Sequence, residues 1–512
     1  MISGPADRRR GTGTLRAAAG AIVLLTALLA LRPVDAFAAD VPISLDEAVR
    51  SAIERNLDLR VETYNPAIAQ AGVRRATAIY NAKLSVSAGH AEESAKNGPL
   101  SDFVLRTRSD DFNASVSRLF STGAAATAAF TNAGSSDNLG AASSRLWKPE
   151  MSLTLSQPVL SGFGQEVTAR GITTASDAKE SALAGWRNRA IGIAADARNQ
   201  YFALINAREN LETRKASLAL AQRVHAENQA RVKAGILAEI ELLDSELGVA
   251  QREKDLLDAD KNVLDQADRL RVIVQYPAGA SLSPSESFPE GPSAVPEEDA
   301  TTAALRARPD LAAARISLRT SEFQARVSRN LALPSVALSG TAGVSGLGRE
   351  YGTAVDDAAS GKYPFWSVGI AFAYPLGNDA AEADLAAARL QARRAQASIR
   401  TLEESIGLDV RAAVRNLASK HQQIAVAQKG VELAEARLAS YLKRQKLGLA
   451  TTKDVLQVET DLVTSRVGLA SARADYQNAV TQLHKSTGEL LDRHGIAIDD
   501  AAVLNSAWKE LP

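Results

Sequence analysis

Residues 242–270 read LLDSELGVAQREKDLLDADKNVLDQADRL, and residues 455–483 read VLQVETDLVTSRVGLASARADYQNAVTQL. In each stretch a large apolar residue returns at every seventh position. These residues are Leu242, Val249, Leu256, Val263 and Leu270, and then Val455, Leu462, Leu469, Tyr476 and Leu483. A strict seven-residue period predicts helices that pack along a seam as a left-handed coiled coil. A soluble coiled-coil bundle has the same period, so this pattern alone leaves that alternative open.

A longer helix is expected before each of these stretches. The patterns predict helices over 165–233 and 379–446, each followed by a glycine-containing turn and then a helix over 238–273 or 452–488. At 1.5 Å per residue, the longer helix spans about 100 Å. No compact globular domain needs a helix of that length, so we expect two extended α-hairpins.

The two hairpins belong to an internal repeat. The two heptad series correspond at a constant offset, and NLDL at 56–59 aligns with RPDL at 308–311. The repeat also carries an extra segment, 91–148, that only the first copy contains. The division that we expect is a first repeat over 40–275, a linker over 276–298, a second repeat over 299–492 and a C-terminal tail over 493–512. Each repeat opens with a helical segment, about 45–80 and 299–331.

Short segments between the helices alternate apolar residues with small or hydroxyl residues. The apolar positions are Leu84 and Val86, Met151, Leu153 and Leu155, Val336 and Leu338, and Trp366, Val368, Ile370 and Phe372. Such alternation predicts strands with one apolar face. Their length suits tilted membrane strands, and Trp147, Tyr363 and Phe365 lie at strand starts, where interfacial aromatic residues occur. A soluble sandwich would show the same alternation.

Two pairs of strands are too few for a closed barrel. Because open strand edges cannot face lipid, a membrane location requires several chains to combine their strands. The extra segment 91–148 also alternates. From the residues alone, its hairpin either joins the same sheet or lies outside it.

The N-terminus predicts export. Arg8, Arg9 and Arg10 precede an apolar run, and Ala36-Phe37-Ala38 offers a cleavage site, so residues 1–38 are interpreted as a signal peptide. The apolar run is shorter than the about 20 residues of a membrane-spanning helix. The chain has no cysteine and therefore no disulfide, and its net charge of zero removes the electrostatic argument for a nucleic-acid partner.

The chain resembles the TolC-like outer-membrane efflux protein family. The segments that carry the resemblance are SLDEA at 44–48, QPVL at 157–160, AGIL at 234–237, LPSV at 333–336, YPL at 374–376 and LGLATTKDVL at 447–456. The resemblance implies a mainly α fold with membrane β-strands, built from a duplicated α-hairpin/β-hairpin unit. As a homotrimer, this unit would form an outer-membrane β-barrel continued by a periplasmic α-helical barrel. The implied location is the cell outer membrane, with a large periplasmic portion.

The implied function is that of the outer-membrane exit channel of a tripartite efflux or type I secretion system. Such a channel is a passive conduit, and its implied partners are a periplasmic adaptor protein, an inner-membrane pump or ATP-binding transporter, and outer-membrane lipid. The residues show no catalytic constellation, and the five histidines show no metal-site spacing, so we expect neither an enzyme nor a cofactor. A periplasmic coiled-coil adaptor or scaffold protein remains the alternative. Nothing in the sequence identifies the cargo.

The resemblance also implies adaptor-docking tips where the hairpins turn. These residues are Gly235, Ile236, Leu237, Gly448, Leu449 and Ala450. Glycine also suits a helix end because it tolerates a left-handed backbone, so simple C-caps are an alternative explanation of the glycines.

A pore gate is implied near the same tips. Asp454 matches the first of two acidic positions in the family pattern and Glu241 matches a latch partner, whereas Gln457 and Ala450 depart from the pattern. Three copies of Asp454 would form a ring that attracts cations. Alternatively, Asp454 and Glu241 favour the positive end of the helix dipole, because each lies in the first turn of its helix.

Overall fold

The computed structural model describes residues 40–96, 104–138, 145–277, 281–289 and 295–508. The expected signal peptide, 1–38, lies outside these residues. No helix in the described ranges combines the length and apolar character that crossing a bilayer requires.

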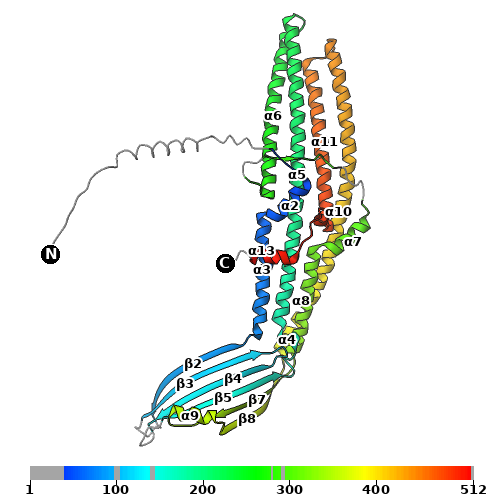
Figure 1. The fold of residues 1–512 in the computed structure, drawn as a ribbon. Helices are drawn as coiled ribbons and strands as arrows, with labels where there is room; N and C mark the ends of the chain where they lie inside the picture. The colour runs from blue at the N-terminus through cyan, green and yellow to red at the C-terminus, as the bar shows by residue number, and fades with distance from the viewer. Residues whose placement is uncertain (1–39, 97–103, 139–144, 278–280, 290–294, 509–512) are drawn as a thin grey trace, which may run out of the picture.

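Two long α-hairpins stand side by side at one end of the molecule (Figure 1). The first consists of α5 (Arg170–Lys233) and α6 (Glu239–Val274), and a short helix, α4 (Gln165–Thr168), precedes it. The second consists of α10 (Asp379–Lys446) and α11 (Thr452–Thr487). These bounds differ from the expected helices chiefly at the start of α5, because the helix is interrupted at Ala169.

Each helical segment that opens a repeat is two helices rather than one. The first divides into α2 (Leu45–Arg55) and α3 (Leu57–Thr77), followed by the 3₁₀ turn η1 (Ala78–Tyr80). Asn56 breaks it because its side chain caps α3 by accepting hydrogen bonds from the backbone N–H groups of Asp58 and Leu59. The second divides into α7 (Glu297–Ala307) and α8 (Pro309–Leu331), because proline disfavours a helical backbone at the preceding residue, Arg308.

A six-stranded antiparallel sheet occupies the opposite end of the molecule. Its order is β2-β3-β4-β5-β7-β8. The strands are β2 (Lys83–Lys96), β3 (Val104–Leu119), β4 (Ala125–Asp137), β5 (Leu146–Pro158), β7 (Ser335–Ser345) and β8 (Tyr363–Ala373). Helix α9 (Tyr351–Ala359) connects β7 to β8. The hairpin of the extra segment, β3–β4, therefore lies within the sheet, which answers the question that the residues left open.

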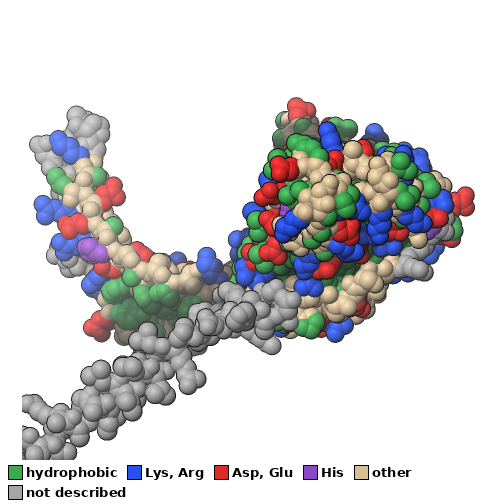
Figure 2. Space-filling model, turned by 90° about the horizontal axis from the view of Figure 1, so that it is seen from above, with side chains coloured by type: hydrophobic (Ala, Val, Ile, Leu, Met, Phe, Trp, Pro, Cys, Tyr) green, Lys and Arg blue, Asp and Glu red, His purple; other side chains and the backbone are tan. Residues whose placement is uncertain are grey.

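The sheet has one apolar and one hydroxyl-rich face. One row of directly paired residues runs across all six strands: Leu84, Val116, Ala128, Leu153, Ala342 and Trp366. The next row, on the opposite face, holds Lys83, Ser117, Thr127, Thr154, Thr341 and Ser367. Trp366, Val368 and Ile370 on the apolar face are all more than 70% exposed in the single chain. Figure 2 shows a hydrophobic patch on the sheet, between its charged far end and the helices.

The main core lies where the hairpins meet the smaller elements. Tyr201, Phe202 and Leu270 are fully buried there. Strand β1 (Asp40–Ile43) pairs in parallel with β6 (Ser281–Pro284), and the Tyr201 hydroxyl donates to the Ile43 carbonyl over 3.1 Å. Segment 276–298, expected as a linker, thus supplies a strand to this region. The expected tail supplies α13 (Asp500–Trp508), which packs on α3, and α12 (Leu490–Arg493) lies just before it.

Candidate functional site

Both hairpins turn in the same way at their tips. Gly235 and Gly448 take left-handed backbones, with φ of 72° and 74°. In each turn the next residue, Ile236 or Leu449, donates its backbone N–H to the carbonyl five residues earlier over 2.9 Å. This closing bond requires the left-handed residue, so glycine is favoured at both positions. The two tips are therefore equivalent products of the repeat.

The tips present apolar side chains to solvent. Ile236 is 76% exposed and Leu449 is 65% exposed, whereas Leu237 and Ala450 are half-buried. Exposed aliphatic side chains at the end of a rigid hairpin are unusual unless something binds them. The sequence expectation placed its docking residues at these same turns.

The Asp454 carboxylate caps the start of α11. It accepts a hydrogen bond from the Thr451 backbone N–H over 2.9 Å, and the Thr451 hydroxyl accepts one from the Asp454 backbone N–H. This reciprocal capping box holds the pKa of Asp454 below its usual value, first through the Thr451 backbone hydrogen bond. Asp454 is exposed and charged, as a gate residue would have to be, but its local contacts are those of a helix cap.

Glu241 reaches across from the first hairpin to the same helix end. Its Oε2 accepts a hydrogen bond from the Thr452 backbone N–H over 2.8 Å. Beside it, the Asn228 amide donates to the Thr452 hydroxyl over 2.7 Å. The structure thus brings Asp454 and Glu241 to adjacent N–H groups of one helix terminus, where the helix dipole favours negative charge.

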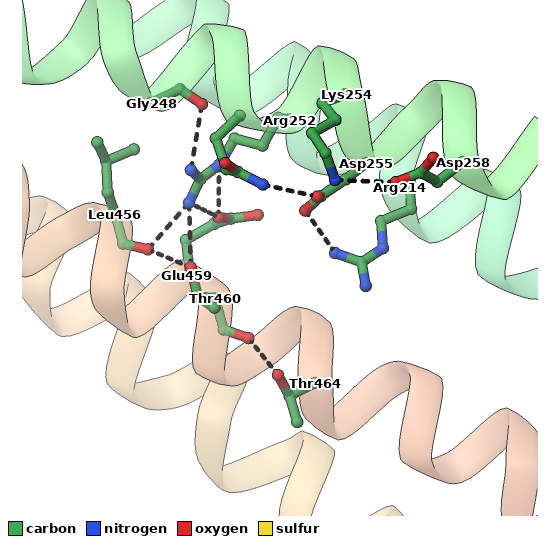
Figure 3. Close-up of polar contacts among 11 residues, drawn as sticks. Arg214, Gly248, Arg252, Lys254, Asp255, Asp258, Leu456, Glu459, Thr460 and Thr464 are labelled. Carbon is green, nitrogen blue, oxygen red and sulfur yellow. Dashed lines mark hydrogen bonds and ion pairs between the residues drawn. The ribbon is translucent and has the colours of Figure 1, made fainter.

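A buried ion pair joins the hairpins farther from the tips (Figure 3). Arg252 on α6 donates from Nε and Nη2 to Oε2 of Glu459 on α11, over 3.0 and 2.5 Å. Arg252 Nη2 also donates to the Leu456 carbonyl over 3.1 Å. The Arg252 side chain is 9% exposed and that of Glu459 is 4% exposed. Two desolvated charges in this geometry lock α6 against α11, because separating them would leave each one buried and unpaired.

Sequence reasoning missed this ion pair. Both residues lie inside the heptad stretches, where charged positions are normally solvated helix faces. One available signal was Gly248, because a glycine inside a helix marks a place where another chain segment approaches closely. A Cβ at Gly248 would lie 2.6 Å from Leu456 Cδ1, so the glycine allows the two helices to approach at the ion pair.

Exposed apolar side chains also line the outer faces of the hairpins. On α6 these are Ile240, Leu243, Leu247, Leu257 and Leu264, and on α10 they include Leu408, Val426 and Leu433. Their three-, four- and seven-residue spacings place them along one stripe of each helix. Such a stripe is typical of a helix that packs against another helix, and the single chain leaves both stripes uncovered.

The chain matches proteins of known family. Residues 301–489 match the family model described as "Outer membrane efflux protein". The chain is 22% identical over 236 residues to the outer membrane efflux protein BepC of Brucella suis biovar 1 (strain 1330). That match covers 46% of this chain and 49% of BepC, so it spans about half the length of this curated relative. Residues 301–489 of the chain thus resemble the outer membrane efflux protein family.

The solved structures with the same fold include outer-membrane channels. The CmeC channel of Campylobacter jejuni matches with a TM-score of 0.64 and 16% identity, over 91% of this chain and 90% of CmeC. The outer membrane protein VceC of Vibrio cholerae matches with a TM-score of 0.64 and 18% identity, over 87% of this chain and 96% of VceC. These matches cover most of the chain, whereas the family model covers only residues 301–489.

These comparisons confirm the expected resemblance to this family, and the structure and the fold matches confirm the expected combination of long α-hairpins and a β-sheet. The matched family model describes outer membrane efflux proteins, and the solved structures with this fold include outer-membrane channels. Within the described residues, no three His, Cys, Asp or Glu side chains gather where they could hold a metal ion.

Proposed function

We propose that the chain is the outer-membrane exit channel of a tripartite efflux or type I secretion system. In this role it conducts substrates passively and catalyses no reaction. One observation carries the proposal: the single chain leaves both edges of its sheet, β2 and β8, and most of its apolar sheet face uncovered. Lipid can cover the apolar face, but an open strand edge in lipid is costly, so the edges require further strands.

A homotrimer supplies those strands. Neighbouring strands alternate in direction across the sheet, so β2 and β8 run antiparallel to one another. Strand β8 of one copy is therefore oriented to pair with β2 of the next, and repetition of this contact closes a ring. The exposed stripes on α6 and α10 lie on the same chain and would be covered by neighbouring hairpins. Three copies would then place six hairpins around one tube.

The tips are the proposed docking surface for a periplasmic adaptor protein. Ile236 and Leu449 project from equivalent turns, so a trimer would offer two similar apolar sites in each copy. An adaptor bound there would align the tube with an inner-membrane pump or ATP-binding transporter, which delivers the substrate.

The contacts behind the tips are the proposed gate. Glu241 holds the start of α11 against the first hairpin, and the Arg252–Glu459 ion pair holds the same two helices together farther along. Widening the end of the tube requires the second hairpin to move away from the first, so these contacts favour the closed state. Asp454, exposed at the same end, supplies a negative charge to the passing solution.

Fractionation and mass measurement test the proposal. The mature chain should sediment with outer membranes and, after extraction in mild detergent, have three times the mass of one chain. A soluble periplasmic monomer would contradict the channel and favour the alternative, a coiled-coil adaptor or scaffold. That alternative offers no reason for an exposed apolar face on a six-stranded sheet.

A further inference from the structure

We propose that the inserted hairpin β3–β4 is part of the channel wall and widens the exit. The inference rests on the proposed homotrimeric channel. Six strands from each of three copies give a ring of 18 strands. Without the hairpin, the same three copies would contribute four strands each.

The internal repeat shows that β3–β4 is an insertion. Strand β2 corresponds to β7, since Leu84 and Val86 align with Val336 and Leu338, and β5 and β8 each lead into the long first helix of a hairpin. In the second repeat these two equivalent strands, β7 and β8, pair directly. In the first repeat, β3 and β4 separate β2 from β5. The first copy therefore widens the sheet by one hairpin, the two strands β3 and β4.

The hydrogen-bonding pattern makes the insertion a continuous part of the sheet. The whole of β2 pairs with β3, from Lys83–Ser117 to Lys96–Val104. Strand β4 pairs with β5 from Ala125–Ser156 to Ser135–Leu146. A flap or plug attached to a narrower wall would leave β2 free to pair with β5.

The two faces of the sheet also continue through the insertion. Phe112, Val116 and Phe130 lie on the apolar face with Met151 and Leu153. A one-residue slip in register would move this whole set to the other face, so the match is specific. If the hairpin lay outside the wall, its apolar face would not need to line up with the apolar faces of the adjacent strands β2 and β5.

The opposite face of the insertion would line the passage. It carries Ser115, Ser117, Thr127 and Thr131, continuous with Ser152 and Thr154 of β5 and with Ser339 and Thr341 of β7. Asp111 is the charged residue of β3 on this face, at the middle of the strand. A lining rich in hydroxyl groups suits hydrated, polar solutes, because it offers them hydrogen bonds.

The insertion changes the size of the exit. With strands about 4.8 Å apart and tilted by about 40°, 18 strands close at a backbone radius of about 18 Å and 12 strands at about 12 Å. The inserted hairpins thus enlarge the radius by about half, and the exit accepts solutes that a 12-stranded wall would exclude.

Distances across the trimer test the inference. The chain has no cysteine, so Ser339→Cys introduces a single thiol, on the hydroxyl face of β7. In spin-labelled trimers, symmetry-related β7 backbones should lie about 31 Å apart in an 18-stranded wall and about 21 Å apart in a 12-stranded one. A full-length value near 21 Å overturns the inference and leaves the homotrimeric channel intact. Absence of trimers overturns the proposed function together with the inference.

A second label and a deletion sharpen the test. Thr127→Cys lies on the inserted hairpin itself and should also give about 31 Å, whereas a plug or an outer flap would give a different distance from Ser339→Cys. Replacing residues 97–144 by a short Gly-Ser linker should shorten the Ser339→Cys distance by about one third. An unchanged distance in the folded deletion variant contradicts the inference. If that variant does not fold, the distances measured with Ser339→Cys and Thr127→Cys in the full-length chain decide whether the hairpin is part of the wall.

Discussion

Arg252 on α6 and Glu459 on α11 form a buried ion pair with an Nη2–Oε2 distance of 2.5 Å. It is the deepest charged contact described between the two hairpins, and it lies behind the proposed docking tips. The guanidinium also binds the Leu456 carbonyl and the Thr460 hydroxyl, so Arg252 is held to α11 at several points. We therefore expect it to stabilise the closed arrangement of the hairpins.

Removing one partner of this pair should destabilise the hairpins strongly. Arg252→Met or Glu459→Gln is expected to cost about 3–5 kcal/mol, because the remaining charged or polar group stays buried without its partner. Thermal unfolding in detergent, followed by circular dichroism, measures the loss. The double variant with Arg252→Met and Glu459→Leu should recover most of it.

The exposed pair Arg437–Asp461 provides a matched control for this prediction. It joins α10 to α11 within the second hairpin, at 2.9 Å, but both side chains are well exposed. Arg437→Ala should cost less than about 1 kcal/mol. Equal losses at the buried and the exposed pair would show that burial does not set the strength of the Arg252 contact.

Glu241→Gln should favour the open channel. The charged acceptor for the Thr452 N–H is lost, and a carboxylate at a helix N-terminus contributes about 0.3–1 kcal/mol. We expect open probability in planar bilayers to rise about two- to fivefold. Glu239→Gln, in the same first turn of α6, serves as the control. If both variants behave like the wild type, Glu241 does not hold the gate.

Asp454→Ala should reduce cation preference at low salt. The pKa of Asp454 is lowered by its hydrogen bonds to Thr451, so the wild-type carboxylate stays charged as pH falls, down to below the ordinary aspartate pKa. Cation preference in the wild type should therefore persist at pH 5, and reversal potentials in planar bilayers measure it. Unchanged reversal potentials in Asp454→Ala would remove this residue from the gate.

Charging the tips should disable export. Ile236→Asp combined with Leu449→Asp replaces two exposed apolar side chains with charges that an apolar partner surface would have to desolvate. We expect loss of export with trimers retained, measured by substrate release and by detergent-solubilised mass. The conservative pair Ile236→Leu with Leu449→Ile is the control. Normal export by the charged variant would mean that the adaptor docks elsewhere.

The protein should lose stability as pH falls from about 6.5 towards 4. Burial, together with the nearby Arg198 charge, lowers the pKa of His484 to about 4 in the folded chain. Unfolded chains bind a proton at this histidine from about pH 6.5 downward, whereas folded chains do not, so acid favours unfolding over this window. His484→Gln should flatten the pH dependence of the melting temperature between these values. If the melting temperature of the variant and that of the wild type depend on pH with the same slope, His484 does not cause the loss of stability in acid.

Local patterns predicted much of the helical part. Helices α6 and α11 were expected over 238–273 and 452–488 and are observed at Glu239–Val274 and Thr452–Thr487. Heptad residues such as Leu270, Val455 and Leu483 are buried as the seam requires. The breaks at Asn56 and Arg308 were missed, although a capping side chain and a following proline marked them. Both signals are local and were available in the sequence.

The sequence by itself determined the α-hairpins, their duplication, the glycine turns at the tips and the alternating faces of the strands. All of these follow from residue spacing, because helical and strand periods and backbone preferences act over a few neighbouring residues. Only the tertiary structure decided that β3–β4 lies inside the sheet, that Glu241 binds the Thr452 N–H, and that Arg252 meets Glu459. These contacts join residues far apart in the chain. Partner choice among distant residues depends on which surfaces the packed elements bring together, and no local period encodes it.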